Sequence, residues 1–260
     1  MTTKSAKTTT GAEIDVISID TGTVMLKVLG RTPLICNRLS EKARFQLLLP
    51  PTKKNAVEKA TTLKHNPVDE YRASVMRTKG EAETAIALPA TAFKGALCSA
   101  ALDMPGTKKA QIGRLTFVEG EQIQIFGKPQ IFSTITRSAD MNKTPDVRTR
   151  AILPEWAAIV PVTFMRPLLN EMAIYRLMVA AGITIGVGDF RQQKGAGNYG
   201  SFNVIAEDDE KSMARFNAIL EQGKAVQESA LQDPEPYDDE TAELLAWFDV
   251  EVKRRGFKVA

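Results

Sequence analysis

The chain has 260 residues, of which 43% are hydrophobic and 25% are charged, and its formal net charge is +3. It contains no run of eighteen apolar residues and no apolar leader, which argues against a membrane-spanning protein and predicts a cytoplasmic one without a membrane partner. Only Cys36 and Cys98 are present. Two cysteines exclude a disulfide framework and lack zinc-site spacing, so both are predicted to lie in the core.

The charges are unevenly distributed along the chain. Residues 207–240 carry 11 acidic and 3 basic side chains, whereas the first 206 residues have a net charge of about +10. A basic body with an acidic C-terminal extension at 207–260 is typical of a protein that binds polyanions. Solvated faces that happen to be segregated would give the same pattern, so charge alone does not decide between the two interpretations.

The N-terminal part of the chain predicts one element of a sheet followed by an excursion. Residues 1–12 are rich in Thr and Lys and are predicted to be disordered, ahead of a core at 13–206. Strand-like residues from Glu13 to Leu29 are interrupted by Asp20-Thr21-Gly22, which predicts a hairpin turn. The basic, proline-containing segment 30–87 is predicted to leave the core, with short helices at Glu41–Leu49 and Pro67–Met76.

The first core helix is predicted after Leu88-Pro89, with Thr91 as its N-cap and an apolar stripe that ends at Pro105-Gly106. Alternating apolar residues predict further strands, at Arg114–Val118, Gln122–Phe126, Gln130–Thr136 and Ala157–Met165. The polar segment 137–153 between the last two predicts a loop or an extended hairpin that projects like a thumb.

A second helix is predicted at Asn170–Ala181, with Gly182 just beyond its C-terminus. Strand-like residues flank a glycine-rich segment after it, and the acidic extension contains helix-like stretches at Glu210–Glu221 and Thr241–Arg254. Strands and two helices in this order predict an α+β fold, with the helices on an antiparallel sheet of ferredoxin-like type.

The glycine-rich segment is the most informative motif for function. Its glycines allow positive φ angles and close approach of backbone N–H groups to an anion, while its cations supply charge and its aromatic rings offer faces for bases. A hairpin that merely needs tight turns would have the same glycines. The residues predicted to contact nucleic acid here are Gly186, Gly188, Phe190, Arg191, Lys194, Gly195, Gly197, Tyr199 and Gly200.

Two segments, LPATAFKGALCSAA at the first helix and GVGDFRQQKGAGNYGSF near the end of the core, resemble the paired signatures of the RAMP superfamily, particularly the guide-RNA-binding backbone subunits of CRISPR effector complexes. The resemblance implies a modified RNA-recognition-motif core with a thumb, and polymerisation along one nucleic-acid strand. A virus-encoded or stand-alone relative that binds single-stranded DNA or RNA fits the residues equally well. Subunits of this family that cut RNA carry an aspartate after the first strand, and Pro33–Asn37 contains no acid.

Further cations outside the glycine-rich segment are candidate phosphate contacts. Lys94 lies near the start of a predicted helix, where N–H groups favour anions, and Arg148 and Arg150 alternate at strand spacing. Either arginine could instead form a salt bridge with Asp146 or Glu155. Weaker candidates of the same kind are Arg38 and Arg44.

The leading hypothesis is therefore a binding subunit that coats single-stranded RNA or DNA as a homo-oligomer or beside other effector subunits, with no cofactor and no metal. The alternatives are a metal-dependent nuclease that uses Asp69 or Asp189, and an assembly protein without a nucleic-acid role. His65, the single histidine, has no evident catalytic partner in the sequence and is predicted to be a surface residue. Trp247 is predicted to be an anchor for a neighbouring subunit.

Overall fold

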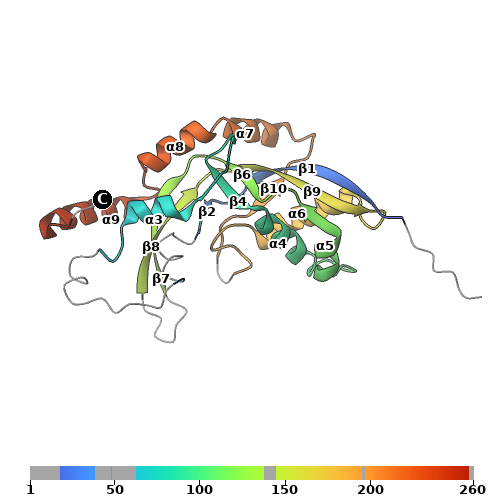
Figure 1. Ribbon diagram of the computed structural model, residues 1–260, viewed down its shortest axis with the longest axis horizontal. Helices are drawn as coiled ribbons and strands as arrows, with labels where there is room; N and C mark the ends of the chain where they lie inside the picture. The colour runs from blue at the N-terminus through green and yellow to red at the C-terminus, as the bar shows by residue number, and fades with distance from the viewer. Residues whose placement is uncertain (1–17, 39–47, 49–62, 138–144, 195–196, 258–260) are drawn as a thin grey trace, which may run out of the picture.

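The computed structural model describes residues 18–38, 48, 63–137, 145–194 and 197–257 (Figure 1). These ranges form a mixed α/β protein with antiparallel sheets, in agreement with the predicted α+β class. None of the helices in them combines the length and the apolar character that a membrane crossing requires. In chain order the elements are β1 (Asp20–Gly30), β2 (Leu34–Ile35), α3 (Pro67–Ser74), β3 (Met76–Arg77), β4 (Ile86–Pro89), α4 (Ala90–Ala100), α5 (Lys109–Leu115), β5 (Thr116–Val118), β6 (Gln122–Phe126), β7 (Gln130–Arg137), β8 (Pro145–Leu153), β9 (Ala157–Arg166), α6 (Glu171–Ala180), η1 (Ala181–Ile185), β10 (Phe202–Val204), α7 (Glu210–Leu220), α8 (Lys224–Gln232) and α9 (Asp239–Arg255).

The larger sheet has the strand order β10-β1-β9-β6-β4-β3, and β5 also pairs with β9. Its long central pair is β1 with β9, which runs antiparallel from Asp20↔Arg166 to Leu29↔Ala157. Successive side chains of a strand point to opposite faces, so every second residue of β9 packs beneath α4 and α6. These buried residues are Ala158, Val160, Val162 and Phe164.

The predicted turn at Asp20-Thr21-Gly22 is wrong, because these residues belong to β1 and pair with β9. Gly22 instead lets the strands' side chains pack closely. A Cβ atom there would lie 2.8 Å from the ring of Phe164 and 2.6 Å from the guanidinium of Arg166. The glycine therefore serves side-chain packing within a continuous strand.

The two helices on this face follow their predicted positions with different ends. α4 begins at Ala90, one residue before the predicted cap Thr91, and its N-cap Pro89 offers no side-chain hydrogen bond. α6 begins at Glu171, one residue after the predicted first residue Asn170, whose side chain caps the helix and accepts from the backbone N–H of Ala173 at 2.8 Å. Gly182 does not end the second helix, because the chain continues there into the π-helix η1.

A smaller sheet, β2-β8-β7, projects from the larger one (Figure 1). β7 and β8 are the two arms of a hairpin, which agrees with the extended-hairpin alternative for 137–153; residues 138–144 lie outside the described ranges. α3 packs on β8 and falls within the helix predicted at Pro67–Met76. The helix predicted at Glu41–Leu49 and the predicted disordered residues 1–12 also lie outside those ranges, except for Leu48.

The C-terminal extension is helical, as predicted, but it is built into the body of the protein. α7 covers part of the sheet face opposite α4, where Phe216 and Ile219 are buried against Leu29 and Ala157 (Figure 1). α8, for which the sequence predicted no helix, packs at the start of β4 and the end of β6 through the buried side chain of Gln227. α9 contacts β7.

Candidate nucleic-acid interface

The two sequence motifs, which lie about ninety residues apart in the chain, meet in space at one groove. The groove has a volume of about 510 Å³ between α4 and the glycine-rich loop that follows η1. The wall formed by α4 consists of small residues, and three cationic side chains lie on the loop and at the start of α5. The lining residues are Thr91, Ala92, Gly95, Ala96, Ser99, Lys109, Gly186, Val187, Gly188, Arg191, Gln193 and Lys194.

The small residues of α4 determine how closely a ligand can approach this wall. Thr91, Gly95 and Ser99 recur every fourth residue and therefore lie on one face of the helix. The bulky residues Phe93 and Leu97 lie on another face and are fully buried in the core. A chain lying in the groove would therefore meet hydroxyl groups and helix backbone instead of long side chains.

The cations of the groove come from two separate segments. Lys109 opens α5, whereas Arg191 and Lys194 belong to the loop. The guanidinium of Arg191 donates to the backbone carbonyl of Gly188 at 3.0 Å, which holds this side chain beside the groove. Among the described residues no carboxylate forms an ion pair with any of the three, so their charges are available to an anion.

The glycines serve the backbone of the loop. Gly186, Gly188 and Gly200 have φ angles of +72°, +81° and +68°, in the region that other residues rarely adopt. Gly197 is buried, and a Cβ atom there would lie 1.9 Å from the carbonyl oxygen of Phe190. These positions satisfy the tight-turn interpretation, and their direct contact with a phosphate stays a prediction. Gly195 lies outside the described ranges.

The predicted stacking residues belong to a chain of four aromatic rings. Phe190 lies 6.2 Å from Tyr199, Tyr199 lies 6.4 Å from Phe132 of β7, and Phe132 meets Tyr237 edge-on at 5.5 Å. Burial is the main cause that raises the pKa of Tyr199 above its usual value. Half of the surface of Phe190 is exposed, at 50%. Phe190 is therefore half exposed, while the other three rings connect the loop to the hairpin and to the segment between α8 and α9.

The two predicted arginines of β8 have different surroundings. Arg148 is exposed, opposite Thr134 of β7. Arg150 is only 6% exposed, and its guanidinium pairs with the carboxylate of Asp189 at 2.5 Å. Burial lowers the pKa of Arg150, while the charge of Asp189 opposes that shift. The predicted role of Arg150 as an exposed phosphate contact is therefore corrected: it links the hairpin to the glycine-rich loop.

Two further predicted cations, Lys94 and Arg38, are not among the residues that line the groove. Lys94 of α4 points toward β5, where its ammonium lies 5.8 Å from the ring centre of Phe117. Arg38 is half-buried, and its backbone N–H donates to the carbonyl of Ser74 at the end of α3. Arg44 lies outside the described ranges. The sequence reasoning missed Lys109, whose signal was the pair Lys108-Lys109 shortly after the helix terminator Pro105-Gly106.

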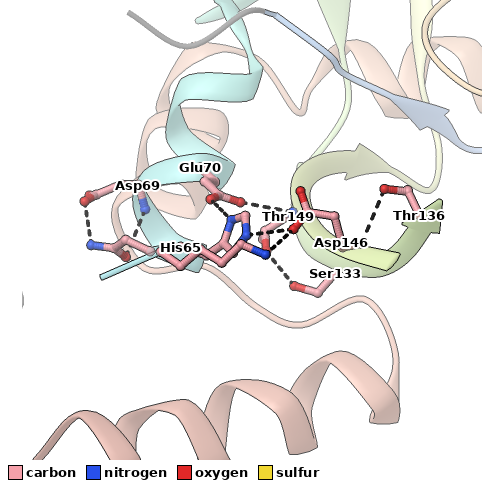
Figure 2. A network of polar contacts seen from close by, with 9 residues as sticks. His65, Asp69, Glu70, Ser133, Thr136, Asp146 and Thr149 are labelled. Carbon is pink, nitrogen blue, oxygen red and sulfur yellow. Dashed lines mark hydrogen bonds and ion pairs between the residues drawn. The ribbon is translucent and has the colours of Figure 1, made fainter. Parts of the chain in front are cut away.

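His65 is not an isolated surface residue, which corrects the prediction. Its Nδ1 lies 2.7 Å from Glu70 of α3, and its Nε2 lies 3.1 Å from Asp146 of β8 (Figure 2). Asp146 also accepts from Lys64 at 2.8 Å, and this contact is the first cause that lowers the pKa of that carboxyl. Glu70 in turn accepts from the backbone N–H of Thr149 at 3.4 Å. These contacts attach α3 to the hairpin.

The acids proposed for a nuclease are engaged elsewhere. Asp189 pairs with Arg150, and Asp69 accepts from the side chain of Asn66 at the start of α3. In the part of the chain that the structure describes, no three His, Cys, Asp or Glu side chains are placed to hold a metal ion together.

Neither the protein-family models nor the curated proteins compared with this chain match it.

Proposed function

We propose that this chain binds single-stranded RNA or DNA along its sugar-phosphate backbone, as a repeating subunit of a filament or an effector-like complex. The observation that carries the proposal is the groove between α4 and the glycine-rich loop. In this groove Lys109, Arg191 and Lys194 lie near a wall formed by small residues of α4. Phosphate contacts of this kind supply most of the affinity of sequence-independent binding.

The path of a strand can be continued beyond the groove. Phe190 belongs to the same loop and is half exposed, and aromatic faces stack on bases without selecting sequence. Arg148 lies on the hairpin face that also carries Phe132 and the link from Arg150 to Asp189. A strand leaving the groove would thus pass Phe190 and reach the guanidinium of Arg148.

The arrangement of the core supports a modified RNA-recognition motif and the proposed relation to the RAMP superfamily. The strands β10, β1, β9 and β6 neighbour one another in that order, with α4 after β1 and α6 after β9 in the chain. A ferredoxin-like βαββαβ core has the same order of elements. The hairpin of β7 and β8 then corresponds to the thumb, and the two family-like motifs form the opposing walls of one groove.

Binding is tested by fluorescence anisotropy with labelled 30-nucleotide RNA and DNA oligomers over a series of salt concentrations. For the wild type we expect the logarithm of the association constant to fall linearly with the logarithm of salt, with a slope of about −0.7 for each neutralised phosphate. Replacing Lys109, Arg191 and Lys194 together by alanine should weaken binding at least tenfold and reduce that slope by about 2.

The matched control is Lys211→Ala, an exposed lysine of α7 on the opposite side of the sheet. It removes one positive charge from the surface away from the groove, where the triple variant removes three, and should leave both affinity and slope close to those of the wild type. Circular dichroism of every variant establishes that the fold is kept. A triple variant that binds as tightly as the Lys211→Ala control, or a wild-type protein that ignores both oligomers, would refute the proposal.

A second readout identifies the polymer. The untagged protein is purified at moderate salt, and the material that copurifies is extracted and treated with RNase or DNase. Recovery of a nucleic acid of discrete length supports a filament, since each subunit would protect a fixed number of nucleotides. Incubation with a divalent metal ion should leave the strand intact, and chelator-sensitive products would favour the nuclease alternative.

A further inference from the structure

α9 is a helix with two opposite faces that both carry apolar side chains. One face carries Thr241, Leu245, Phe248 and Val252, of which Thr241 and Val252 are buried and Leu245 packs against the core. The opposite face bears Trp247 and Val250, which are 60% and 67% exposed. Together they form an exposed apolar patch, the kind of surface that marks protein–protein contacts.

The exposed face continues in both directions with charged residues at coiled-coil spacing. Glu243, Trp247, Val250 and Arg254 are separated by four, three and four residues, so they form one stripe along the helix. The stripe is acidic at its N-terminal end, apolar in the middle and basic at its C-terminal end. All four side chains belong to residues that are exposed to solvent.

This stripe is complementary to itself when two copies run antiparallel. In the register that places Trp247 beside Val250 of a second copy, Glu243 stands opposite Arg254 of that copy. A twofold axis repeats both contacts, which gives two apolar pairs in the centre and an ion pair at each end. Arg254 also binds Glu251 of its own helix at 2.6 Å, and Arg255 remains on Glu251 when Arg254 turns toward the second copy.

We propose that α9 is the interface of a homodimer, in which two α9 helices pair antiparallel about a twofold axis through this stripe. The helix is already fixed in the single chain. Asp238 caps its N-terminus, Gly256 ends it in the left-handed conformation, and Thr241 Oγ1 accepts from the N–H of Ser133. Pairing therefore requires little additional ordering of the helix. α9 also lies at one end of the molecule, beyond α3 and β7 (Figure 1).

A second copy fits this face better than an unrelated partner. When two copies run antiparallel, the acidic end of each stripe faces the basic end of the other and the apolar centres meet. A helix of 17 residues is about 25 Å long. One such pair forms an interface at the small end of the specific range, so the dimer should be in equilibrium with monomer at micromolar concentrations. This inference does not depend on the proposed nucleic-acid function.

The test is sedimentation equilibrium of the full chain after nuclease treatment and a high-salt wash, which remove any strand that could tether copies. The wild type should show a monomer–dimer equilibrium. Trp247→Ala should raise the dissociation constant at least about tenfold, because each dimer loses two aromatic anchors. The fluorescence of Trp247 should shift to shorter wavelength as concentration rises, while the buried Trp156 stays constant.

Charge reversal tests the register. Glu243→Arg or Arg254→Glu alone should weaken the dimer, since like charges then face each other at both ends. An equimolar mixture of the two single variants should associate again, because each end then joins an arginine to a glutamate. Lys211→Ala serves as the unrelated surface control. A wild-type monomer at all concentrations, an oligomer lost with nuclease, or a dimer unaffected by both reversals would overturn the proposal.

Discussion

Replacement of Gln227 by leucine should destabilise the protein strongly, because this fully buried amide makes four hydrogen bonds. Its Oε1 accepts from the backbone N–H groups of Ala85 and Ile86 at 2.8 and 3.1 Å. Its Nε2 donates to the carbonyls of Ile125 and Gly127 at 2.8 and 3.0 Å. One neutral side chain thereby satisfies four backbone groups at the ends of two strands.

Leucine has nearly the same size as glutamine, so Gln227→Leu leaves four buried polar groups without partners and little empty space. At the low end of about 1 kcal/mol for each unsatisfied group, the free energy of unfolding should fall by about 4 kcal/mol. With a urea dependence of about 3 kcal/mol per molar for a chain of this size, the midpoint of unfolding should fall by more than about 1 M.

Urea unfolding followed by circular dichroism measures this change. The control is Gln232→Leu, at the exposed last position of the same helix α8, which should change the free energy of unfolding by less than about 0.5 kcal/mol. A midpoint for Gln227→Leu that lies within about 0.3 M of the wild type would refute the reasoning, since four unsatisfied groups could not cost so little.

Three other predictions concern the candidate interface and the core. Asp189→Ala should lower the free energy of unfolding by about 3 kcal/mol and Arg150→Met by less, because the guanidinium is the more buried of the two charges. In urea unfolding the double variant should be more stable than Asp189→Ala alone, and additive losses would contradict this. Gly200→Ala should lower the melting temperature far more than Gly106→Ala, since both have positive φ but only the first Cβ would meet a carbonyl oxygen, at 1.7 Å. Burial raises the pKa of Cys36 to about 12, so at pH 8 this thiol stays protonated and should react with a disulfide reagent at least about a hundredfold more slowly than in urea.

Local patterns predicted those elements whose structure follows from residues close together in the sequence. Alternation predicted β9, and the apolar residues that follow Asn170 predicted α6. Asp20-Thr21-Gly22 has the composition of a turn, but pairing with the distant β9 overrides that preference. α8 was missed, and its attachment to the body depends on Gln227, whose hydrogen-bond partners lie a hundred or more residues earlier.

The candidate interface likewise combines features that local sequence predicts with features that depend on distant contacts. Both motifs could be identified from residue types alone, since glycines, small residues and cations were sufficient. Their meeting in one groove depends on α4 and η1 packing side by side. The burial of Arg150 could not be predicted, because its alternation with Arg148 is the same whether or not Asp189 lies opposite. Lys109 was overlooked because the pair Lys108-Lys109 does not reveal that the start of α5 lies beside the glycine-rich loop.

The position of β1 has a consequence for how the chain reaches its fold. β1 is made early, yet it pairs with β9 and β10, so that Leu29 meets Ala157 and Gly30 meets Phe202. During synthesis both edges of β1 therefore stay unpaired until β9 and β10 have been made. Contacts so distant along the chain fold slowly, and a truncated product that ends before β9 would expose two unpaired strand edges. Such fragments should aggregate, and slower synthesis at low temperature should improve the yield of folded protein.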